Sequence, residues 1–437
     1  MNLADQVKAA GVVGAGGAGF PTHVKLEASV DWYLANGAEC EPLIHKDREL
    51  MTHFASQVIK GLTLAAQNAH AAPALAIKKK NHQAVAALNK AAAGTPVQLY
   101  YFDDYYPAGD EYELVHTITG NLIPPQGLPL DVGCVVNNVE TLHNICRAAE
   151  GIPVTDTFLT ITGLVKKPLT TWIPLGMSVI EVLKIAGGAT VTAFSVMDSG
   201  LMMGKLITDL QQPVTKTTGG LIVLPTDHSI IQRYSRTQKQ MDRIGFSACD
   251  QCSYCTELCP RYLLGYDVQP HLVMRSLGFT AMGKELWNSF AQLCCRCGLC
   301  TLYSCPEALY PREACIRSMN DLRQMNKGQW QGSRKVKPHF LKEMRRVPLK
   351  QLVQRLGVHS YEKEAEFVEL PIKPKRVTLL LKQHVGVPAK TVVAVGDRVS
   401  RGQLVARVPE GQLGAHLHAS MDGKVTTINH EFLVIEE

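Results

Sequence analysis

The stretch Cys249–Pro260 reads CDQCSYCTELCP, and a second stretch, Cys294–Pro306, reads CCRCGLCTLYSCP. Each contains three cysteines at the spacing C-x2-C-x2-C and ends in a Cys-Pro pair. Three thiolates at this spacing wrap one corner of an iron–sulfur cube, and the fourth cysteine of each run ligates the other cube. The proline that follows ends the local turn. The two runs together predict two [4Fe-4S] clusters, and therefore a carrier of single electrons.

The second run departs from the usual form in two ways. Four residues separate Cys300 from Cys305, where three are usual, so one residue must be bulged out. Cys294 and Cys295 compete for the first position, and we choose Cys294 because it keeps the two-residue spacing to Cys297. The crossed arrangement then assigns Cys249, Cys252, Cys255 and Cys305 to the first cluster, and Cys294, Cys297, Cys300 and Cys259 to the second.

A zinc site and disulfide bonds are the alternatives. Zinc takes four ligands, usually as two separated pairs, so groups of three closely spaced cysteines do not match a zinc site. Disulfides fit poorly with 13 cysteines, an odd number, in a chain whose N-terminus lacks the apolar segment of a signal peptide. We interpret the remaining thiols at Cys40, Cys134, Cys146 and Cys315 as packing residues.

Length and composition are those of a soluble protein with several domains. The 437 residues suggest two to four domains, and 46% of them are apolar. No stretch approaches the eighteen uninterrupted apolar residues of a membrane span, so we expect a cytoplasmic protein. The net charge of +6 comes partly from a basic stretch at 312–350. Because no aromatic platform is interleaved there, we interpret it as a linker or a contact surface for an acidic partner, and expect no nucleic acid.

The pattern of apolar residues changes along the chain. Residues 1–152 alternate between helix and strand, which favours a largely parallel sheet. The expected strands are 32–35, 74–77 and 135–138, the expected helices are 54–70 and 140–149, and Lys78, Lys79 and Lys80 are expected on the surface. Short β-branched strands at 158–162 and 221–224 surround a helix at 178–185, which suggests a helix lying across a small mixed sheet. Residues 236–330 are helical, 331–370 form a basic linker, and 371–437 are all-β.

A glycine-rich loop lies near the N-terminus, where Gly14–Lys25 reads GAGGAGFPTHVK. The G-x-G-x-x-G match within it is a weak signal by itself. A dinucleotide-binding turn needs a strand before it, but residues 3–10 have helical spacing, and Pro21 would disrupt the helix that should follow. We expect instead a loop whose backbone N–H groups approach a phosphate, with Lys25 adding positive charge.

Three segments carry a family resemblance: Gly14–Lys25, Asn36–Pro42 and Asn137–Leu142. They resemble the flavin-binding subunit of respiratory NADH dehydrogenase and the C subunit of the Rnf electron-transport complex. They are most similar to the cobalamin reductases of propanediol-utilisation microcompartments. A barrel-sandwich segment at the C-terminus favours this last family, because the Rnf subunit is expected to carry it at the N-terminus. Val408–Gln412, at the tip of this segment, lacks the lysine of carrier domains, so we interpret it as a docking or structural module.

The resemblance covers nearly the whole chain and implies a multidomain α/β fold. The implied parts are a Rossmann-like domain binding FMN and NADH at 1–152, a soluble-ligand-binding β-grasp domain at 153–235, a helical two-cluster ferredoxin domain at 236–330, the linker at 331–370, and a barrel-sandwich hybrid domain at 371–437.

The resemblance also implies which residues hold the cofactors. It places the FMN phosphate on the loop of Gly14, Gly16, Gly17 and Gly19, with Lys25 nearby. Asn36, Glu39, Asn137 and Asn138 would contact the isoalloxazine and ribityl groups, Glu41 belongs to the same cofactor site, and Asp110 and Glu111 would contact the nicotinamide nucleotide. Ala38 stands where the respiratory subunit has an aspartate, which reduces the number of carboxylates near the flavin.

The implied function is a path for electrons. NADH donates two electrons together and a cluster accepts one, and a flavin converts between the two modes. The implied final acceptor is cobalamin, reduced before adenosylation, and the implied partners are a corrinoid adenosyltransferase and a microcompartment shell protein. The resemblance also implies that this cytoplasmic protein lies inside a microcompartment. The alternative is a non-catalytic relay or docking subunit of an Rnf-like complex.

Overall fold

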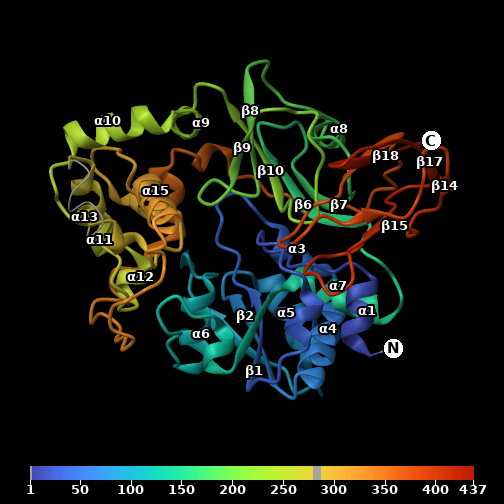
Figure 1. Ribbon diagram of the computed structural model, residues 1–437, viewed down its shortest axis with the longest axis horizontal. Coiled ribbons are helices and arrows are strands. Elements are labelled where there is room, and N and C mark those ends of the chain that lie inside the picture. The colour runs from blue at the N-terminus through green and yellow to red at the C-terminus, as the bar shows by residue number, and fades with distance from the viewer. Residues whose placement is uncertain (1, 279–286) are drawn as a thin grey trace.

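The computed structural model describes residues 2–278 and 287–437. Residue 1 of the predicted flavin domain and residues 279–286 of the predicted ferredoxin domain lie outside the described residues. The chain forms four parts (Figure 1). An N-terminal α/β part lies at the bottom of the view, a mixed sheet lies above it, a cysteine-rich lobe lies on the left, and a C-terminal β part lies on the right.

The N-terminal part is built on a parallel sheet of four strands in the order β3-β2-β1-β5. The strands are β1 (Trp32–Gly37), β2 (Ala72–Lys78), β3 (Gln98–Phe102) and β5 (Cys134–Asn138). The chain adds β2 and β3 on one side of β1 and then places β5 on the other side. The strand order therefore reverses between β1 and β5, and the carboxyl ends of these two strands form a topological switch point.

Helices cover both faces of this sheet because side chains alternate along each strand. Tyr33 belongs to the core shared with α1 (Leu3–Ala9), α4 (Ala55–Asn68) and α7 (Val139–Ala149), whereas the adjacent Leu34 belongs to the core under α6 (Glu111–Thr119). Shorter helices α2 (Thr22–Leu26), α3 (Lys46–His53) and α5 (His82–Ala92) complete this part. The strands and helices predicted here are confirmed, with ends that differ by a few residues.

Lys78 corrects one prediction. We expected it on the surface, but it is the last residue of β2 and its side chain is 0% exposed. Its Nζ lies 2.7 Å from Oδ1 of Asp104. The neighbouring strand β3 and the loop after it cover the position, and the buried charge is stable because it is paired.

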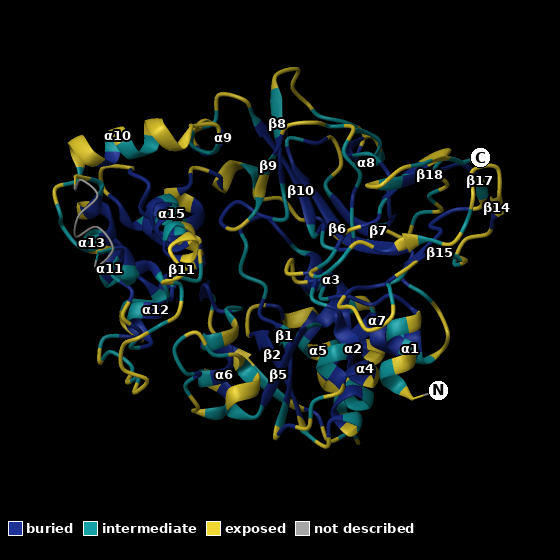
Figure 2. Cartoon of the chain, in the orientation of Figure 1, coloured by how far each residue is buried: buried dark blue, intermediate teal, exposed yellow. Residues whose placement is uncertain are grey.

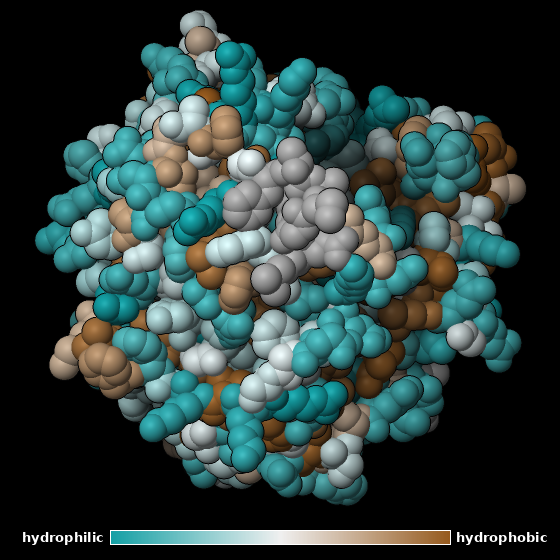
Figure 3. All heavy atoms as spheres, turned by 60° about the vertical axis from the view of Figure 1, so that its left-hand side comes forward, coloured by the Kyte–Doolittle hydropathy of each residue, from teal (hydrophilic) through white to brown (hydrophobic). Residues whose placement is uncertain are grey.

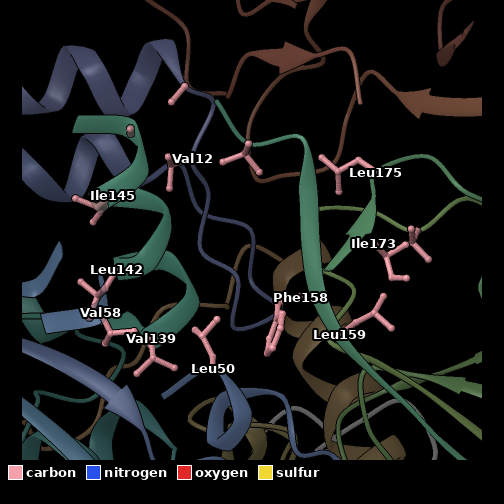
Figure 4. Close-up of a cluster of buried hydrophobic side chains, with 14 of the residues drawn as sticks. Val12, Leu50, Val58, Val139, Leu142, Ile145, Phe158, Leu159, Ile173 and Leu175 are labelled. Atoms are coloured by element: carbon pink, nitrogen blue, oxygen red, sulfur yellow. The ribbon is translucent and has the colours of Figure 1, made fainter. Parts of the chain in front are cut away.

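The second part is a five-stranded mixed sheet in the order β7-β6-β10-β8-β9, with one parallel pair, β6 and β10. The strands are β6 (Asp156–Gly163), β7 (Leu169–Pro174), β8 (Phe194–Asp198), β9 (Lys205–Ile207) and β10 (Gly220–Pro225), and helix α8 (Val179–Ile185) packs with them. Its core is continuous with that of the first part. Figure 4 shows Phe158 of β6 extending toward Leu50 of α3, while Leu159 points to the opposite side toward Ile173.

The cysteine-rich lobe consists of short helices joined by irregular chain. It contains α10 (Gln238–Ala248), α11 (Tyr254–Glu257), α12 (Pro260–Leu263), α13 (Pro270–Arg275) and α15 (Pro311–Gln324), and follows α9 (Ser229–Tyr234). Figure 2 shows α10 largely exposed and the strands of the two sheets largely buried. The shortest of these helices, α11 and α12, have four residues each and lie within and directly after the first cysteine run.

The stretch at 331–370, expected as a linker, is partly folded. Residues Val347–Pro348 form strand β11, which pairs with β4 (Tyr105–Tyr106), and α16 (Leu349–Arg355) follows. Leu352 and Val353 are buried in a core that also contains residues of the mixed sheet and the cysteine-rich lobe. Through apolar contacts, this segment therefore joins the N-terminal part, the mixed sheet and the cysteine-rich lobe.

The C-terminal part contains two antiparallel sheets. One has the order β12-β18-β17-β14 and the other β13-β15-β16. The strands are β12 (Arg376–Leu380), β13 (Lys390–Thr391), β14 (Arg398–Val399), β15 (Leu404–Arg407), β16 (Leu417–His418), β17 (Gly423–Ile428) and β18 (Phe432–Glu436). In the part of the chain that the structure describes, no helix combines the length and apolarity needed to cross a bilayer.

Candidate cofactor sites

The glycine-rich loop follows a helix rather than a strand. Helix α1 ends at Ala9, and the loop closes on itself through bonds from Gly14 N to Phe20 O and from Gly19 N to Gly14 O. Pro21 then precedes the short helix α2. The prediction that this loop is not a dinucleotide-binding turn is confirmed, since in the described chain the element before the loop is a helix, and α2 begins only after Pro21, beyond the glycines.

The tip of the loop offers unused backbone donors. Gly16, Gly17 and Ala18 are exposed, and their N–H groups have no acceptor among residues 2–278 and 287–437. Gly17 has φ +100, and a Cβ atom added there would have no heavy atom within 4 Å. Consecutive free N–H groups beside open space form a concavity that suits an anion. The loop thus fits a phosphate group.

The loop lies at the topological switch point of the parallel sheet. Asn36 at the end of β1 and Asn138 at the end of β5 are register partners. A Cβ atom added to Gly16 would lie 3.4 Å from Cβ of Asn138, and Lys25 donates to Val136 O at 2.7 Å. The structure therefore brings these four predicted residues together at the carboxyl edge of the sheet, where ligands of α/β folds bind. Burial lowers the pKa of the Lys25 ammonium.

Buried polar groups hold Ala15, the residue between the first two glycines. Its N–H donates to Oγ1 of Thr141 at 3.0 Å, and its carbonyl accepts from Nζ of Lys46 at 3.0 Å. Lys46 also pairs with Glu140 at 2.6 Å, and the two side chains are only 5% and 1% exposed. Sequence reasoning assigned no role to these residues, although Glu140 and Thr141 lie inside the resemblance segment Asn137–Leu142.

Two carboxylates lie beside Asn138. Oδ2 of Asp47 accepts from its side-chain amide at 2.7 Å, and the backbone N–H of Asp47 donates to Glu39 at 3.2 Å. Oδ1 of Asp47 is buried and has no partner in the part of the chain that the structure describes. Burial, followed by repulsion from Asp47, raises the pKa of Glu39 to about 8. Asp47 is a further residue that sequence reasoning missed, because α3 carries no recognisable motif.

Other predicted cofactor residues have protein partners instead. Asn137 is buried and donates to the Tyr33 hydroxyl at 2.6 Å. Asp110 caps α6 and pairs with Arg261 at 3.0 Å, which ties the flavin part to the cysteine-rich lobe. Glu111, the next residue, is exposed.

Glu41 also points away from the glycine loop. Its carboxylate accepts N–H groups from Leu201, Met202 and Met203 at 3.0, 2.9 and 2.8 Å. Burial raises its pKa to about 7, while these three bonds oppose the rise. Glu41 therefore connects the end of β1 with a loop of the mixed sheet.

Two cavities of the cysteine-rich lobe are lined by cysteines from both runs. The first cavity is lined by Cys259, Cys294, Cys295, Cys297, Cys300, Pro260, Pro270, Arg296, Gly298 and Arg312. The second cavity is lined by Cys249, Cys252, Cys255, Cys305, Asp250, Gln251, Ser253, His271, Met274, Leu309 and Pro311. The first cavity thus combines four cysteines of the second run with Cys259, the last of the first run, and the second combines three cysteines of the first run with Cys305. This lining supports the crossed ligand sets, which stay a prediction.

The chemistry of the cavities fits iron–sulfur cubes better than a single ion. Cysteine side chains surround each space from several elements, yet among the described residues no three His, Cys, Asp or Glu side chains converge on one metal position. Cys294 and Cys295 both line the first cavity. Cys294 contacts Cys315 and Cys295 contacts Cys297, so the arrangement does not decide between the adjacent thiols.

Figure 3 shows the outer face of this lobe as mainly hydrophilic with small hydrophobic areas.

The extra residue before Cys305 is accommodated as predicted. Residues Cys300–Ser304 form a π-helical turn, which holds one more residue per turn than its α-helical counterpart. The bulge keeps Cys300 at the first cavity while Cys305 reaches the second. The extra residue between Cys300 and Cys305 is thus accommodated by a π-helical turn in place of an α-helical one.

Three family models match separate parts of the chain. The Nuo51 FMN-binding domain matches residues 7–147, the 4Fe-4S dicluster domain matches residues 248–310, and the RnfC barrel sandwich hybrid domain matches residues 354–436. The predicted multidomain α/β protein with an FMN-binding domain, a two-cluster domain and a C-terminal barrel-sandwich domain is confirmed at this level.

Curated relatives match over different lengths. The cobalamin reductase PduS of Salmonella typhimurium is 42% identical over 435 residues, which are 99% of this chain and 96% of that protein. The cobalamin reductase PduS of Citrobacter freundii is 41% identical over 100% of this chain and 96% of that protein. The C subunit of the proton-translocating ferredoxin:NAD(+) oxidoreductase complex of Clostridium ljungdahlii is 33% identical over 59% of this chain and 55% of that protein.

Among solved structures, a chain of an NAD+-reducing [NiFe]-hydrogenase in the H2-reduced state is similar in fold. The TM-score is 0.50 at 21% sequence identity, and the match covers 76% of this chain and 63% of that chain. A likeness at this level of identity concerns the fold alone.

Proposed function

The chain belongs to the family of the cobalamin reductase PduS, and on this premise we propose that it is a flavo-iron–sulfur oxidoreductase that carries electrons from NADH through FMN and two [4Fe-4S] clusters to cobalamin. The observation that carries the proposal is the 42% identity over 99% of the chain and 96% of the relative. A match of this extent includes the flavin part, the cluster lobe and the C-terminal domain together.

The flavin site rests on the residues at the switch point. When bound, FMN links two-electron donors to one-electron acceptors. The free N–H groups of Gly16 and Gly17 would bind its phosphate, and Lys25 would supply charge. Asn36 and Asn138 would orient the ring and ribityl groups, while the Lys46–Glu140 pair keeps the loop in shape through Ala15.

The remaining proposed cofactor residues surround this centre. Gly14 and Gly19 close the loop, and Glu39 lies beside Asp47. Asn137 would act through Tyr33, whereas Glu41, Asp110 and Glu111 would act at the border with the other parts of the molecule.

Two direct contacts support electron transfer between the flavin part and the cluster lobe. The buried Tyr106 hydroxyl donates to the Cys297 carbonyl at 2.6 Å. Arg261, two residues after Cys259, pairs with Asp110, and its guanidinium carbon lies 3.4 Å from the ring centre of Tyr112. Both contacts reach the segments that line the first cavity, so this cavity is joined directly to the flavin part.

The proposal also includes the domain boundaries, the location of the protein and its partners. We propose domain boundaries at 1–152, 153–235, 236–330, 331–370 and 371–437, with a β-grasp fold for the second domain. Its sheet with one parallel pair and helix α8 supports that fold. Family membership supports residence in the cytoplasm inside a microcompartment, with a corrinoid adenosyltransferase and a shell protein as partners.

The test is an anaerobic titration of the reconstituted full-length chain. NADH should bleach the flavin absorbance and then produce the electron paramagnetic resonance signals of reduced clusters, and added hydroxocobalamin should reoxidise both. A reduced protein that leaves hydroxocobalamin unchanged would overturn the assignment of cobalamin as acceptor. A folded preparation that binds neither iron nor flavin would overturn the whole proposal.

A relay component of an Rnf-like complex is the second candidate, because the Clostridium ljungdahlii protein is 33% identical over 59% of this chain. A relay of this kind receives its electrons from a partner and needs no NADH turnover of its own. Turnover of NADH with a dye by the isolated chain therefore favours the enzyme, and bound flavin without turnover favours the relay.

A further inference from the structure

The two cysteine-lined cavities differ in charge. Among the described residues, the cavity of Cys259, Cys294, Cys297 and Cys300 is lined by two arginines, Arg296 and Arg312, and by no carboxylate. In the same part of the chain, the cavity of Cys249, Cys252, Cys255 and Cys305 is lined by Asp250 and by no arginine or lysine. Net charge and hydrogen bonds around the sulfurs are what a protein uses to set the reduction potential of an iron–sulfur cluster. The two clusters therefore have unequal surroundings.

Arg312 is the buried member of the arginine pair. Its side chain is 11% exposed, whereas Arg296 is exposed to solvent. The Arg312 guanidinium donates to Met202 O at 2.6 Å and to the Tyr234 hydroxyl at 3.1 Å. It also forms an ion pair with Glu313 at 2.6 Å, but the guanidinium lines the cavity and the Glu313 carboxylate does not, so the positive end of the pair is the nearer one. A charge in a low-dielectric position acts on its neighbours far more strongly than one surrounded by water.

Cations also lie near the other cavity, but they do not line it. Arg233 donates to the carbonyls of Thr301, Ala308 and Leu309, and Arg355 donates to the Cys305 carbonyl at 3.0 Å. The charge of Arg233 also interacts with Cys305, but neither arginine is part of the cavity wall.

The position of Arg312 depends on a loop from another part of the chain. Met202, which accepts from Arg312, lies in the segment Leu201–Met203 that the Glu41 carboxylate binds through three N–H groups. The Met202 carbonyl also packs on the cluster-binding loop, since a Cβ atom added to Gly298 would lie 2.9 Å from it. A continuous set of contacts thus runs from the end of β1 to the first cavity.

We propose that the charge of Arg312 raises the reduction potential of the cluster bound by Cys259, Cys294, Cys297 and Cys300, and that Glu41 is a positioning residue that keeps Arg312 in place through the loop Leu201–Met203. The inference rests on the proposed function, because it requires both clusters. A fixed positive charge stabilises the reduced cluster, which carries one more negative charge than the oxidised form. Glu41, carried over as a cofactor residue by resemblance, thereby gains a role in tuning the cluster.

The experiment is a redox titration of the full-length, anaerobically reconstituted chain, followed by electron paramagnetic resonance at pH 8. The Cys300→Ser variant first identifies which signal belongs to the first cavity. Arg312→Gln should lower the midpoint potential of that signal and leave the other unchanged. Arg296→Gln, the matched control, removes the same charge from the same cavity but from an exposed position, and should produce a much smaller shift.

Glu41→Ala provides a second test that does not alter the arginine. Removing a nearby anion would by itself raise the potential, whereas releasing the loop that holds Arg312 should lower it, so the sign of the shift distinguishes the two effects. A rise, or equal shifts of both clusters in Arg312→Gln, would overturn the inference. Iron and flavin contents measured on the same samples separate this failure from failure of the proposed function, which would appear as missing clusters or flavin.

Discussion

The glycine-rich loop and the cysteine-rich lobe hold their cofactors in opposite ways. Each cysteine cavity is lined by cysteines that come mostly from one run of about a dozen residues, together with a single cysteine of the other run. The flavin site instead gathers residues from the N-terminal loop, from the ends of β1 and β5, and from α3. A cluster site can therefore be recognised from spacing alone, whereas a flavin site of this kind depends on the packing of distant segments.

The largest expected effect concerns the crossing cysteines. Cys259→Ser should remove the cluster whose other ligands lie in the second run, and Cys305→Ser should remove the cluster of the first run. In each case roughly half of the iron should be lost, since one of two cubes remains. Iron analysis and electron paramagnetic resonance of each variant check the result, and loss of the cluster in the same run as the mutated cysteine would contradict it.

The next effect concerns the buried pair under the glycine loop. Lys46→Met should leave Glu140 as an unpaired buried charge and lower the free energy of unfolding by about 3–5 kcal/mol. Denaturant unfolding of the flavin-free chain measures the change. The double variant Lys46→Met, Glu140→Leu removes both charges and should recover most of the loss, and a double variant as unstable as the single one would show that packing, not the unpaired charge, is responsible.

A smaller effect is expected at the tip of the loop. Gly17→Trp should reduce FMN affinity a hundredfold or more, about 2.7 kcal/mol, because the side chain occupies the open space beside the free N–H groups. Gly94→Trp is the matched control, since Gly94 also has a positive φ, of +75, and open space around it but lies in a distant turn. Flavin content and fluorescence titration measure both. Equal loss in the control would mean that the substitution acts through backbone strain.

The smallest effect concerns Glu39. Because its pKa is raised from 4.5 to about 8 in the folded chain, the folded state holds this proton more tightly than the unfolded state. Its contribution to stability is complete below pH 4.5 and is lost as the pH rises through 8. We expect the flavin-free chain to lose about 1–2 kcal/mol over this window, less than the full shift implies because the carboxylate is only half-buried. Thermal unfolding from pH 5 to 9 should show a flatter profile for Glu39→Gln, and an unchanged slope would contradict the assignment.

Sequence reasoning succeeded where the signal was local. The alternation of helix and strand predicted the parallel sheet, and the extra residue before Cys305 predicted the bulge that appears as a π-helical turn. It was wrong for Lys78, whose burial depends on the neighbouring strand. It also treated 331–370 as a linker, because the partners of β11 and α16 lie far away in the chain. It missed Lys46 and Asp47 for the same reason.

Before any fold is known, the amino-acid order of this chain predicts two iron–sulfur clusters and a glycine-rich loop suited to a phosphate, because both predictions depend on covalent spacing over a few residues. Tertiary structure alone decided that Asn36 and Asn138 are neighbours, that Glu41 holds the loop Leu201–Met203, and that Arg312 lines one cavity. These contacts join residues more than a hundred positions apart, and only the strand order and the packing of the parts against one another bring them together.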